Sequence, residues 1–428
     1  MLLTQRNNMP IATELPAILG GDQAITLNQV EANAWPIIST QDEQAVLDVL
    51  RSGNLSLHPI VGELEEAYKK RTGRNFAVTH NNGTSAILAG LHAIGIEPFD
   101  EVIVPSATWW SSVMPVLHCG GVPVFAELEP TSLGLDPEDV ERKITSKTKA
   151  IVLVHLFGMP SKVDELVAIA KKHNLKILED ASHAHGATYK GKPIGSFGDV
   201  SIFSMQGNKL CPSGEGGILL CDDEEMYESV IRLGHYERLL NLESKNKYFA
   251  ATGFGFKFRM APMAAALAYS QLQKLDERNA KRNQNCQYLS GKLEELGFET
   301  FLSTGDTQRV YFEFLVRYDM QKTGLPINDL AKALQAEGAL VAAPRYPLLH
   351  QQPVFTQRVW SKIARLPATE ENPIHTYDPM DLPNTTVGNG TLLKLPSFPS
   401  ADTALLDQYL IAFEKVVAHA DDIPRTES

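Results

Sequence analysis

Hydrophobic and polar positions follow two alternating patterns along the first part of the chain. Short apolar runs without polar alternation, such as 150–156, predict strands that are buried on both faces of a sheet. Between them lie segments with helical spacing, such as 39–53, where Ser39 is a candidate N-cap and Gly53 a stop signal. Repeated strand–helix units predict an α/β protein with a mostly parallel sheet flanked by helices on both sides.

The predicted elements divide the chain into an arm and two domains. Strands are predicted at 76–79, 101–105, 123–128, 150–156 and 176–180, and helices at 39–53, 61–73, 86–95, 136–144, 163–173 and 224–233. Beyond these we expect one long helix from about 260 to 297, a strand at 310–316, helices at 328–338 and 401–419, and a proline-rich stretch at 344–383. This pattern predicts an N-terminal arm (1–34), a large domain (35–280) and a smaller α+β C-terminal domain (281–428).

Composition narrows the classes of partner. The chain has 428 residues, of which 43% are hydrophobic and 21% charged, as in a globular protein with a large core. A formal net charge of −12 argues against a nucleic acid or an anionic membrane as the main partner. The N-terminus lacks the apolar core of a signal peptide. Four scattered cysteines favour a reduced, cytoplasmic protein and give no metal site.

One lysine stands out by its surroundings. Lys209 lies in a turn between two short apolar runs, 202–203 and 218–220, and a glycine cluster at 214–217 follows it. Glycines allow backbone to approach a ligand closely. A lysine held between buried strands is partly desolvated, which favours the neutral, nucleophilic amine needed for Schiff-base chemistry. For a lone lysine, a solvated loop side chain remains the alternative.

Small polar residues follow several predicted strands, at 80–85, 106–112 and 180–185. In parallel sheets ligands bind beyond the carboxyl ends of the strands, so these segments and Lys209 are expected to meet. The turn at 80–85 leads into a helix and offers backbone amides to an anion. Asp180 is a candidate partner for a pyridine nitrogen, and Trp109 is a candidate stacking group. A capping carboxylate and a core or rim tryptophan are the alternatives.

Together these residues fit a pyridoxal phosphate site, in which a phosphate cup would be formed by Gly83, Thr84, Ser85 and Ser204. The motifs that carry a family resemblance are Asn-Gly-Thr-Ser-Ala (82–86), Asp-Glu-Val-Ile-Val-Pro-Ser-Ala-Thr-Trp (100–109), Val-His-Leu-Phe-Gly (154–158), Glu-Asp-Ala-Ser-His-Ala-His-Gly-Ala (179–187), Gly-Ser-Phe-Gly-Asp (195–199) and Lys209 with Gly-Glu-Gly-Gly (214–217). With them the chain, from about Trp35 onward, resembles the DegT/DnrJ/EryC1/StrS family of sugar and cyclitol aminotransferases, which have the fold-type I architecture of pyridoxal phosphate enzymes.

The resemblance implies a role for each matching position. Lys209 corresponds to the family's aldimine lysine, Asp180 to the partner of the pyridine nitrogen and Trp109 to the stacking aromatic. His183 falls where the family has Gln or His near the phenolic oxygen of the cofactor. The phosphate ligands of the family correspond to Thr84, Ser85 and Ser204.

One position departs from the family pattern. Segment 255–260 resembles the stretch from which an asparagine reaches the cofactor phosphate of the neighbouring subunit, but here that position is Lys257. An ammonium group could replace the amide as a charged donor, or it could face solvent. Either way, the resemblance implies a homodimer with shared active sites.

The expected function is ping-pong transfer of an amino group from glutamate or glutamine, through a Lys209 aldimine, to a nucleotide-linked keto-sugar or a keto-cyclitol. The rivals are a sugar dehydratase of the same fold and a non-catalytic regulatory or binding homologue. The family's dehydratases carry histidine in place of the lysine. Candidate substrate contacts are Arg345, Tyr346, His350 and the loop 375–378, for which ordinary surface residues are the alternative.

Overall fold

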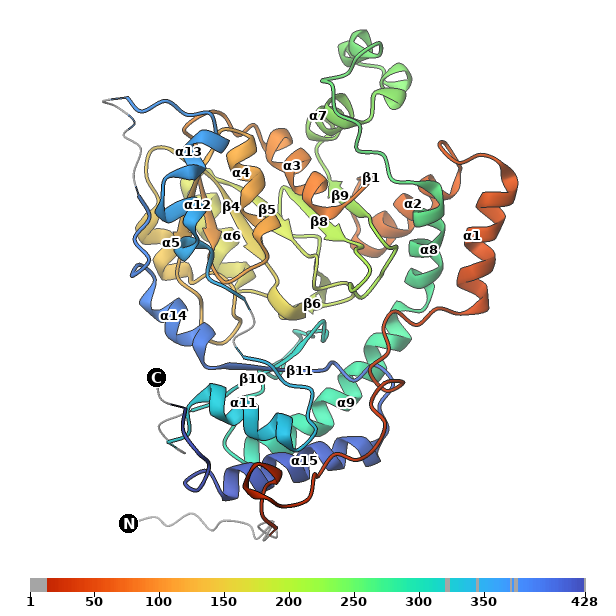
Figure 1. Ribbon diagram of the computed structural model, residues 1–428. Helices are drawn as coiled ribbons and strands as arrows, with labels where there is room; N and C mark the ends of the chain where they lie inside the picture. Colours follow the sequence, from red (N-terminus) through yellow and green to blue (C-terminus); the bar gives the residue numbers. More distant parts are fainter. Residues whose placement is uncertain (1–13, 320–323, 344–345, 370–371, 373–375, 427–428) are drawn as a thin grey trace.

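Seven strands form the central sheet of the computed structural model, which describes residues 14–319, 324–343, 346–369, 372 and 376–426 (Figure 1). The strand order is β1-β9-β8-β5-β4-β2-β3. All strands run parallel except β9, which pairs antiparallel with both β1 and β8. The predicted mostly parallel α/β sheet is therefore confirmed. The strands are β1 (Phe76–His80), β2 (Glu101–Pro105), β3 (Val122–Ala126), β4 (Thr148–Val154), β5 (Lys176–Asp180), β8 (Val200–Ser204) and β9 (Gly217–Cys221).

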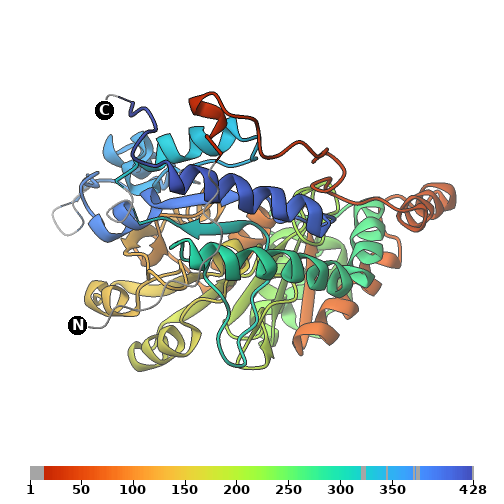
Figure 2. The ribbon, with the colours of Figure 1, turned by 90° about the horizontal axis from the view of Figure 1, so that it is seen from below.

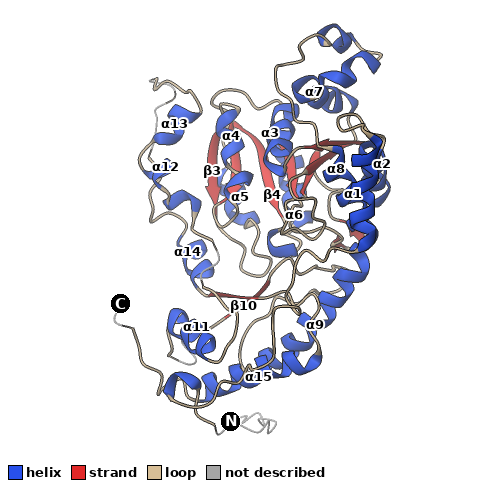
Figure 3. Cartoon of the chain, turned by 45° about the vertical axis from the view of Figure 1, so that its right-hand side comes forward, coloured by secondary structure: helices blue, strands red, loops and turns tan. Residues whose placement is uncertain are grey.

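Helices cover both faces of this sheet, as Figure 3 shows. Alternate residues of a strand enter different cores: Val102 and Val104 of β2 pack on one side and Ile103 on the other. The first face is covered by α3 (Gly83–Ile94), α4 (Met114–His118) and α7 (Glu224–Gly234). The second face is covered by α2 (Ile60–Thr72), α5 (Pro137–Lys143), α6 (Val163–His173) and α8 (Pro262–Gln273).

The helix α1 (Thr40–Ser52) is fixed at its start by a capping box. Ser39 caps it, and Asp42 accepts from the Ser39 amide at 2.8 Å. The same carboxylate binds Ser270 at 2.6 Å and Lys274 at 3.0 Å, which joins α1 to the end of α8.

The single long helix predicted at 260–297 is wrong. It is divided at Lys274 (φ −103°, ψ −1°), which ends α8 and precedes α9 (Leu275–Glu295).

A second hydrophobic core lies below the sheet in Figure 1. It is enclosed by α9, α11 (Ile327–Ala336), α15 (Thr403–Ala418) and the antiparallel pair β10 (Phe314–Arg317) and β11 (Leu392–Leu395). The helices predicted at 328–338 and 401–419 are thus confirmed. The strand predicted at 310–316 is shorter, because the Val310 amide bonds to the Gly158 carbonyl (3.1 Å) instead of a strand partner.

The described part of the proline-rich stretch contains two short α-helices, α12 (Pro353–Thr356) and α13 (Val359–Ile363), and α14 (Pro383–Gly390) begins at its last residue. Trp360 and Tyr377 from this stretch pack into the core of the large sheet, not into the second core. Because α9 also crosses residue 280, the division into a large and a small domain there stays a prediction. A two-stranded ribbon, β6 (Thr188–Tyr189) and β7 (Lys192–Pro193), completes the strands.

The described part of the N-terminal segment lies beside α15 and leads to α1, as Figure 2 shows. The Glu337 carboxylate accepts from the amides of Ala17 (2.6 Å) and Ala24 (2.8 Å), and the buried Lys415 ammonium pairs with it at 3.1 Å. This segment is therefore fixed to the second core. In the part of the chain that the structure describes, no helix has the length and apolar character needed to cross a bilayer.

A buried carboxylate fixes the loop beside β5. Glu179 is fully buried and accepts from the amides of Gly195 (2.6 Å), Phe197 (2.9 Å) and Gly198 (3.0 Å), with His155 at 3.1 Å. These bonds hold the pKa of Glu179 below its usual value against the effect of burial, which raises it.

We expect Glu179→Gln to lower the free energy of unfolding by about 2 to 4 kcal/mol, because an amide NH₂ would face backbone donors in a buried place. Urea unfolding followed by circular dichroism measures this change. The control is Glu141→Gln, a partly exposed glutamate paired with Lys172 and His173, which should change stability little. Equal effects of the two substitutions would contradict the structural role of Glu179.

Candidate active site

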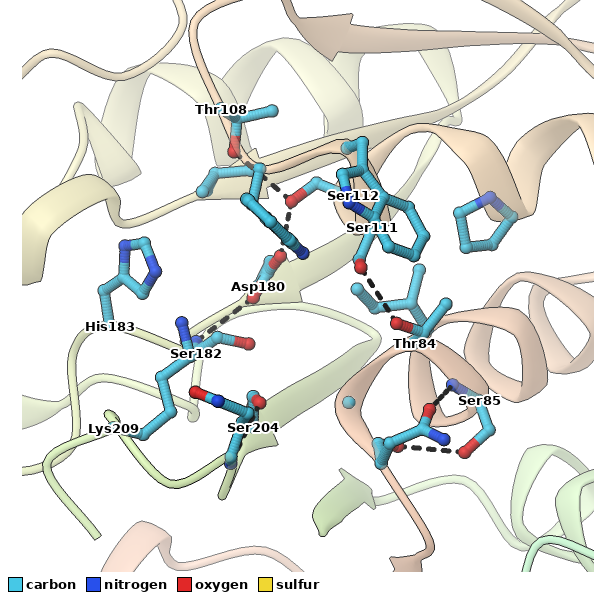
Figure 4. A pocket seen from close by; sticks show the side chains of 18 of the residues that line it. Thr84, Ser85, Thr108, Ser111, Ser112, Asp180, Ser182, His183, Ser204 and Lys209 are labelled. Atoms are coloured by element: carbon cyan, nitrogen blue, oxygen red, sulfur yellow. Dashed lines mark hydrogen bonds between the residues drawn. The ribbon is translucent and has the colours of Figure 1, made fainter. Parts of the chain in front are cut away.

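The carboxyl ends of β1, β2, β4, β5 and β8 meet at one edge of the sheet, around a cavity of about 680 Å³ (Figure 4). Its wall collects most of the predicted site residues, although they come from distant parts of the chain. The lining includes Gly83, Thr84, Ser85, Thr108, Trp109, Trp110, Ser111, Ser112, His118, Asp180, Ser182, His183, Ser204, Gln206, Asn208, Lys209, Glu215, Phe312 and Tyr346.

Asp180 is the last residue of β5 and only 4% exposed. One carboxylate oxygen accepts from the Ser112 hydroxyl at 2.7 Å, and the other accepts from the Ser182 amide at 3.1 Å. Because the Ser112 hydrogen is directed to Asp180, the Ser112 oxygen accepts from the Thr108 hydroxyl at 3.3 Å. These hydrogen bonds orient the carboxylate toward the cavity. Ser112 was not predicted, although its place in the polar run after β2 was a usable signal.

Lys209 lies in the loop that joins β8 to β9, a hairpin closed by bonds between Met205 and Gly216 and between Gly207 and Gly214 (2.8 Å each). Gly214 has φ +86°, a conformation that favours glycine. The Lys209 side chain points into the site toward Asp180 in Figure 4. Its Nζ lies 4.5 Å from the ring centroid of Phe312.

His183 stacks on Phe312, the same ring that the Lys209 Nζ approaches. Its ring lies 4.0 Å from that of Phe312, with an angle of 17° between the planes. The Phe157 amide donates to Nδ1 at 3.3 Å. In the neutral ring the hydrogen is therefore on Nε2, which leaves that nitrogen as a donor.

The other end of the cavity is suited to an anion. The N-terminus of α3 presents the residues Gly83 and Thr84, where the helix dipole favours negative charge. Hydroxyl groups of Thr84 and Ser111 bond to each other at 2.8 Å, and Ser204 stands beside Gly83. A Cβ at Gly83 would lie 2.8 Å from the Ser204 Cβ, so only glycine fits there. The hydroxyl of Ser85, in contrast, donates to the Asn81 side chain and to the Asn82 carbonyl at the start of α3.

Aromatic side chains form the rim of the cavity. Trp109 is 48% exposed and lies beside Trp110 (5.7 Å between centroids) and Tyr346 (6.4 Å). Tyr346 is buried and stacks on Phe157 with an angle of 14° between the rings. Trp109 and Tyr346 both line the cavity, and their roles as stacking group and substrate contact stay predictions.

Two predicted residues do not line the cavity. His350 is buried below it, with Nδ1 at 2.7 Å from the Ser106 hydroxyl. Lys257, which was expected to reach a neighbouring subunit or to face solvent, is exposed on the segment that precedes α8. Arg345 and His375 lie outside the described residues. Thr108, Trp110, Ser111, Ser112 and Ser182 also line the cavity; they lie in segments that were expected to meet there, but they were given no individual role. Lining residues outside the segments expected to meet include His118, Gln206, Asn208, Glu215 and Phe312.

Below the cavity, His185 supports the end of β8. It is fully buried, and its ring bonds the Tyr68 hydroxyl and the Ser204 carbonyl, each at 2.9 Å. Burial lowers the pKa of His185 to about 3, and the nearby Lys209 adds to the effect. The ring is therefore neutral at physiological pH, with Nε2 donating to Ser204. Over the described residues, no group of three His, Cys, Asp or Glu could hold a metal ion.

Known proteins with this fold and sequence define the class. The family model described as the DegT/DnrJ/EryC1/StrS aminotransferase family matches residues 36–385. The Spore coat polysaccharide biosynthesis protein SpsC of Bacillus subtilis is 31% identical over 90% of this chain and 97% of its own. The L-glutamine:scyllo-inosose aminotransferase of Streptomyces griseus is 30% identical over 96% of this chain and 99% of its own.

Solved structures agree with the sequence matches. The aminotransferase from Psychrobacter cryohalolentis superposes with a TM-score of 0.80, at 25% identity over 91% of this chain and 99% of that chain. An Escherichia coli GDP-4-keto-6-deoxy-D-mannose-3-dehydratase shares the fold (TM-score 0.76, 22% identity, 89% of this chain and 98% of that chain). The fold is that of the pyridoxal phosphate-dependent aminotransferases. The chain belongs to the DegT/DnrJ/EryC1/StrS aminotransferase family.

The neutral, buried His185 makes stability depend on pH. An exposed histidine titrates near 6.5, whereas the pKa of His185 in the folded chain is about 3. Below pH 6.5 the His185 imidazole binds a proton in the unfolded chain but not in the folded chain. His185 therefore destabilises the fold progressively as the pH falls from 6.5 toward 3, by at most about 1.4 kcal/mol per pH unit.

We expect His185→Asn to be less stable than the wild type at pH 7.5 and to lose this pH dependence. The difference between the two proteins should shrink by roughly 1 kcal/mol between pH 7 and pH 5.5. Urea unfolding at several pH values measures it, with the partly exposed His419→Asn as a control. A constant difference across this range would show that His185 is not kept neutral by folding.

Proposed function

We propose that this aminotransferase moves the amino group of L-glutamine to an inosose-type keto-cyclitol, with pyridoxal phosphate bound at the carboxyl edge of the sheet. The observation that carries the proposal is the meeting of Lys209, Asp180 and a hydroxyl-lined helix N-terminus in one cavity. These are an amine, a carboxylate and an anion site, which are the groups that this cofactor requires of a protein.

The residues fit the cofactor on grounds of chemistry and space. Gly83 leaves bare backbone beside Ser204, where a Cβ would fill the space. Thr84, Ser111 and Ser204 offer hydroxyl donors for a phosphate, as does the N-terminus of α3. Pyridoxal phosphate, when bound, supplies an aldehyde for the amino group and a ring that delocalises electrons from the substrate carbon.

Each polar residue has a distinct task in this proposal. Asp180, oriented by the Ser112 hydroxyl and the Ser182 amide, would hold a proton on the pyridine nitrogen. His183 would donate from Nε2 to the phenolic oxygen, since Nδ1 already accepts from Phe157. Trp109, at the rim of the cavity, would stack on the pyridine ring. Lys209 would anchor the cofactor and, once its Nζ is released, take and return the proton of the substrate carbon.

The lining also bears on the acceptor. Among the described residues around the cavity, Lys209 is the sole lysine or arginine, and most of the other polar side chains are uncharged hydroxyl and amide groups, Gln206 and Asn208 among them. Such a wall suits the hydroxyls of an uncharged cyclitol better than the two negative charges of a nucleoside diphosphate. The name of the Streptomyces griseus relative, which specifies glutamine and scyllo-inosose, favours the same choice.

A dehydratase of this fold is the second candidate function. The retention of Lys209 in the cavity argues against it, because the resemblance places a histidine there in those enzymes.

We also propose a cytoplasmic location, which is supported by four cysteines that are all unpaired.

We further propose a homodimer in which Lys257 reaches the cofactor phosphate of the partner. A lobe formed by residues 236–257 projects at the top of the molecule in Figure 1. It exposes large apolar side chains, among them Tyr248 (81% exposed), Leu240, Phe249 and Phe256. Exposed apolar groups gathered on one projection favour burial against another protein surface.

Replacing Lys209 tests the assignment. We expect Lys209→Ala to lose the visible absorption band of the cofactor-loaded enzyme and to reduce transfer about 10²- to 10⁴-fold. The matched control is Lys149→Ala, an exposed lysine at the opposite edge of the sheet, which should retain both. In the intact enzyme, L-glutamine should remove the band, and scyllo-inosose should restore it faster than a nucleotide-linked keto-sugar. Retention of full turnover in Lys209→Ala would refute the proposal.

Mixing two inactive variants tests the shared site. Lys209→Ala and Lys257→Ala subunits, unfolded and refolded together, should give hybrid dimers that contain one intact site. We expect activity to return to roughly a quarter of the wild-type value, since half of the dimers are hybrids with one of two sites intact. Size-exclusion chromatography checks the assembly. Dimers without recovered activity would mean that Lys257 does not act across the interface.

A further inference from the structure

The backbone of Lys209 is held by a residue far away in the sequence. The indole Nε1–H of Trp35 donates to the carbonyl oxygen of Lys209 at 3.0 Å. The Lys209 amide donates to the Gln206 carbonyl at 2.7 Å, and the next residues, Leu210 and Cys211, are buried against the core. Both backbone polar groups of the lysine are thus bonded, one of them to the N-terminal segment.

The indole of Trp35 is itself held in place by two arginines of α9. The Arg282 guanidinium lies 3.8 Å from the ring centroid, and that of Arg278 lies 5.6 Å away. Arg282 is 1% exposed, and burial lowers its pKa to about 10, so it stays charged at neutral pH. A cation over an indole ring is an attractive arrangement, and it strengthens when water is excluded.

The chain on either side of Trp35 is also fixed. Downstream, the Ile37 carbonyl accepts from Arg278 (2.9 Å) and from Gln271 (3.1 Å). Upstream, the Ser400 amide donates to the Ala32 carbonyl at 3.0 Å. The donor of the bond to Lys209 therefore belongs to a segment that is anchored on the second core and on α8 and α9.

We infer that Trp35 is a positioning residue, whose indole N–H fixes the carbonyl of Lys209 and thereby sets where Nζ stands in the cavity. The inference rests on the proposed role of Lys209 in anchoring the cofactor. A lysine side chain has a fixed maximum length, so the position of its backbone limits where Nζ can stand in the cavity. Catalytic groups tolerate little such displacement.

The test compares two tryptophan variants of the cofactor-loaded enzyme. Trp35→Phe keeps an aromatic face for Arg282 and removes the N–H, whereas Trp360→Phe removes another buried indole in α13, away from Lys209. For Trp35→Phe we expect kcat to fall about 3- to 10-fold, with KM for L-glutamine changed less than about 2-fold. The pH midpoint of the visible band should move by roughly half a unit. Trp360→Phe should leave this midpoint and kcat near the wild-type values.

A third variant removes the N–H without changing the shape of the side chain. Site-specific 3-benzothienylalanine at position 35 puts sulfur in place of the N–H, and it should reproduce the kinetic and spectral effects even if Trp35→Phe folds poorly. A midpoint and kcat equal to those of the wild type in this variant would overturn the inference. If instead the wild type forms no visible band, or Lys209→Ala keeps it, the proposed function is what fails.

Discussion

The register between β5 and β8 is the constraint on which the site depends. Asp180, the last residue of β5, pairs with Ile202, so that Ser204 ends β8 beside the aspartate and the chain can turn toward Lys209. A slip of one residue would turn every side chain to the other face. The carboxylate would then point into the core and the hydroxyl away from α3. The network of Glu179 with the 195–198 amides secures the loop between these two strands.

The antiparallel strand β9 determines where Lys209 lies. Because β9 returns beside β8, the two strands form a hairpin whose loop carries Lys209 at the edge where the parallel strands end. Pairing with β1 on the other side brings the helix α3 to the same edge. The amine and the anion site thus come from neighbouring strands, and Phe312 reaches the amine from the chain that leads into β10.

Much of this arrangement could be predicted from the sequence, because its signals are local. Apolar runs predicted the strands, and the polar segments that follow them contained Gly83, Trp109 and Asp180. What escaped prediction depends on contacts between distant residues. Ser112 was missed because its partner, Asp180, comes from another strand. His350 was predicted as a polar substrate contact, with an ordinary surface residue as the alternative, but it is buried. Trp360 and Tyr377 instead anchor that stretch in the large core and bury the histidine with it.

The central claim is that Lys209, among all lysines of the chain, carries the cofactor. Its most direct test is borohydride reduction of the protein loaded with pyridoxal phosphate, followed by proteolysis and mass spectrometry. We predict that the pyridoxyl mass is found on the peptide that contains Lys209, and that a variant lacking Asp180 carries less of it. A pyridoxyl group on another lysine, or on none, would contradict the assignment of the site.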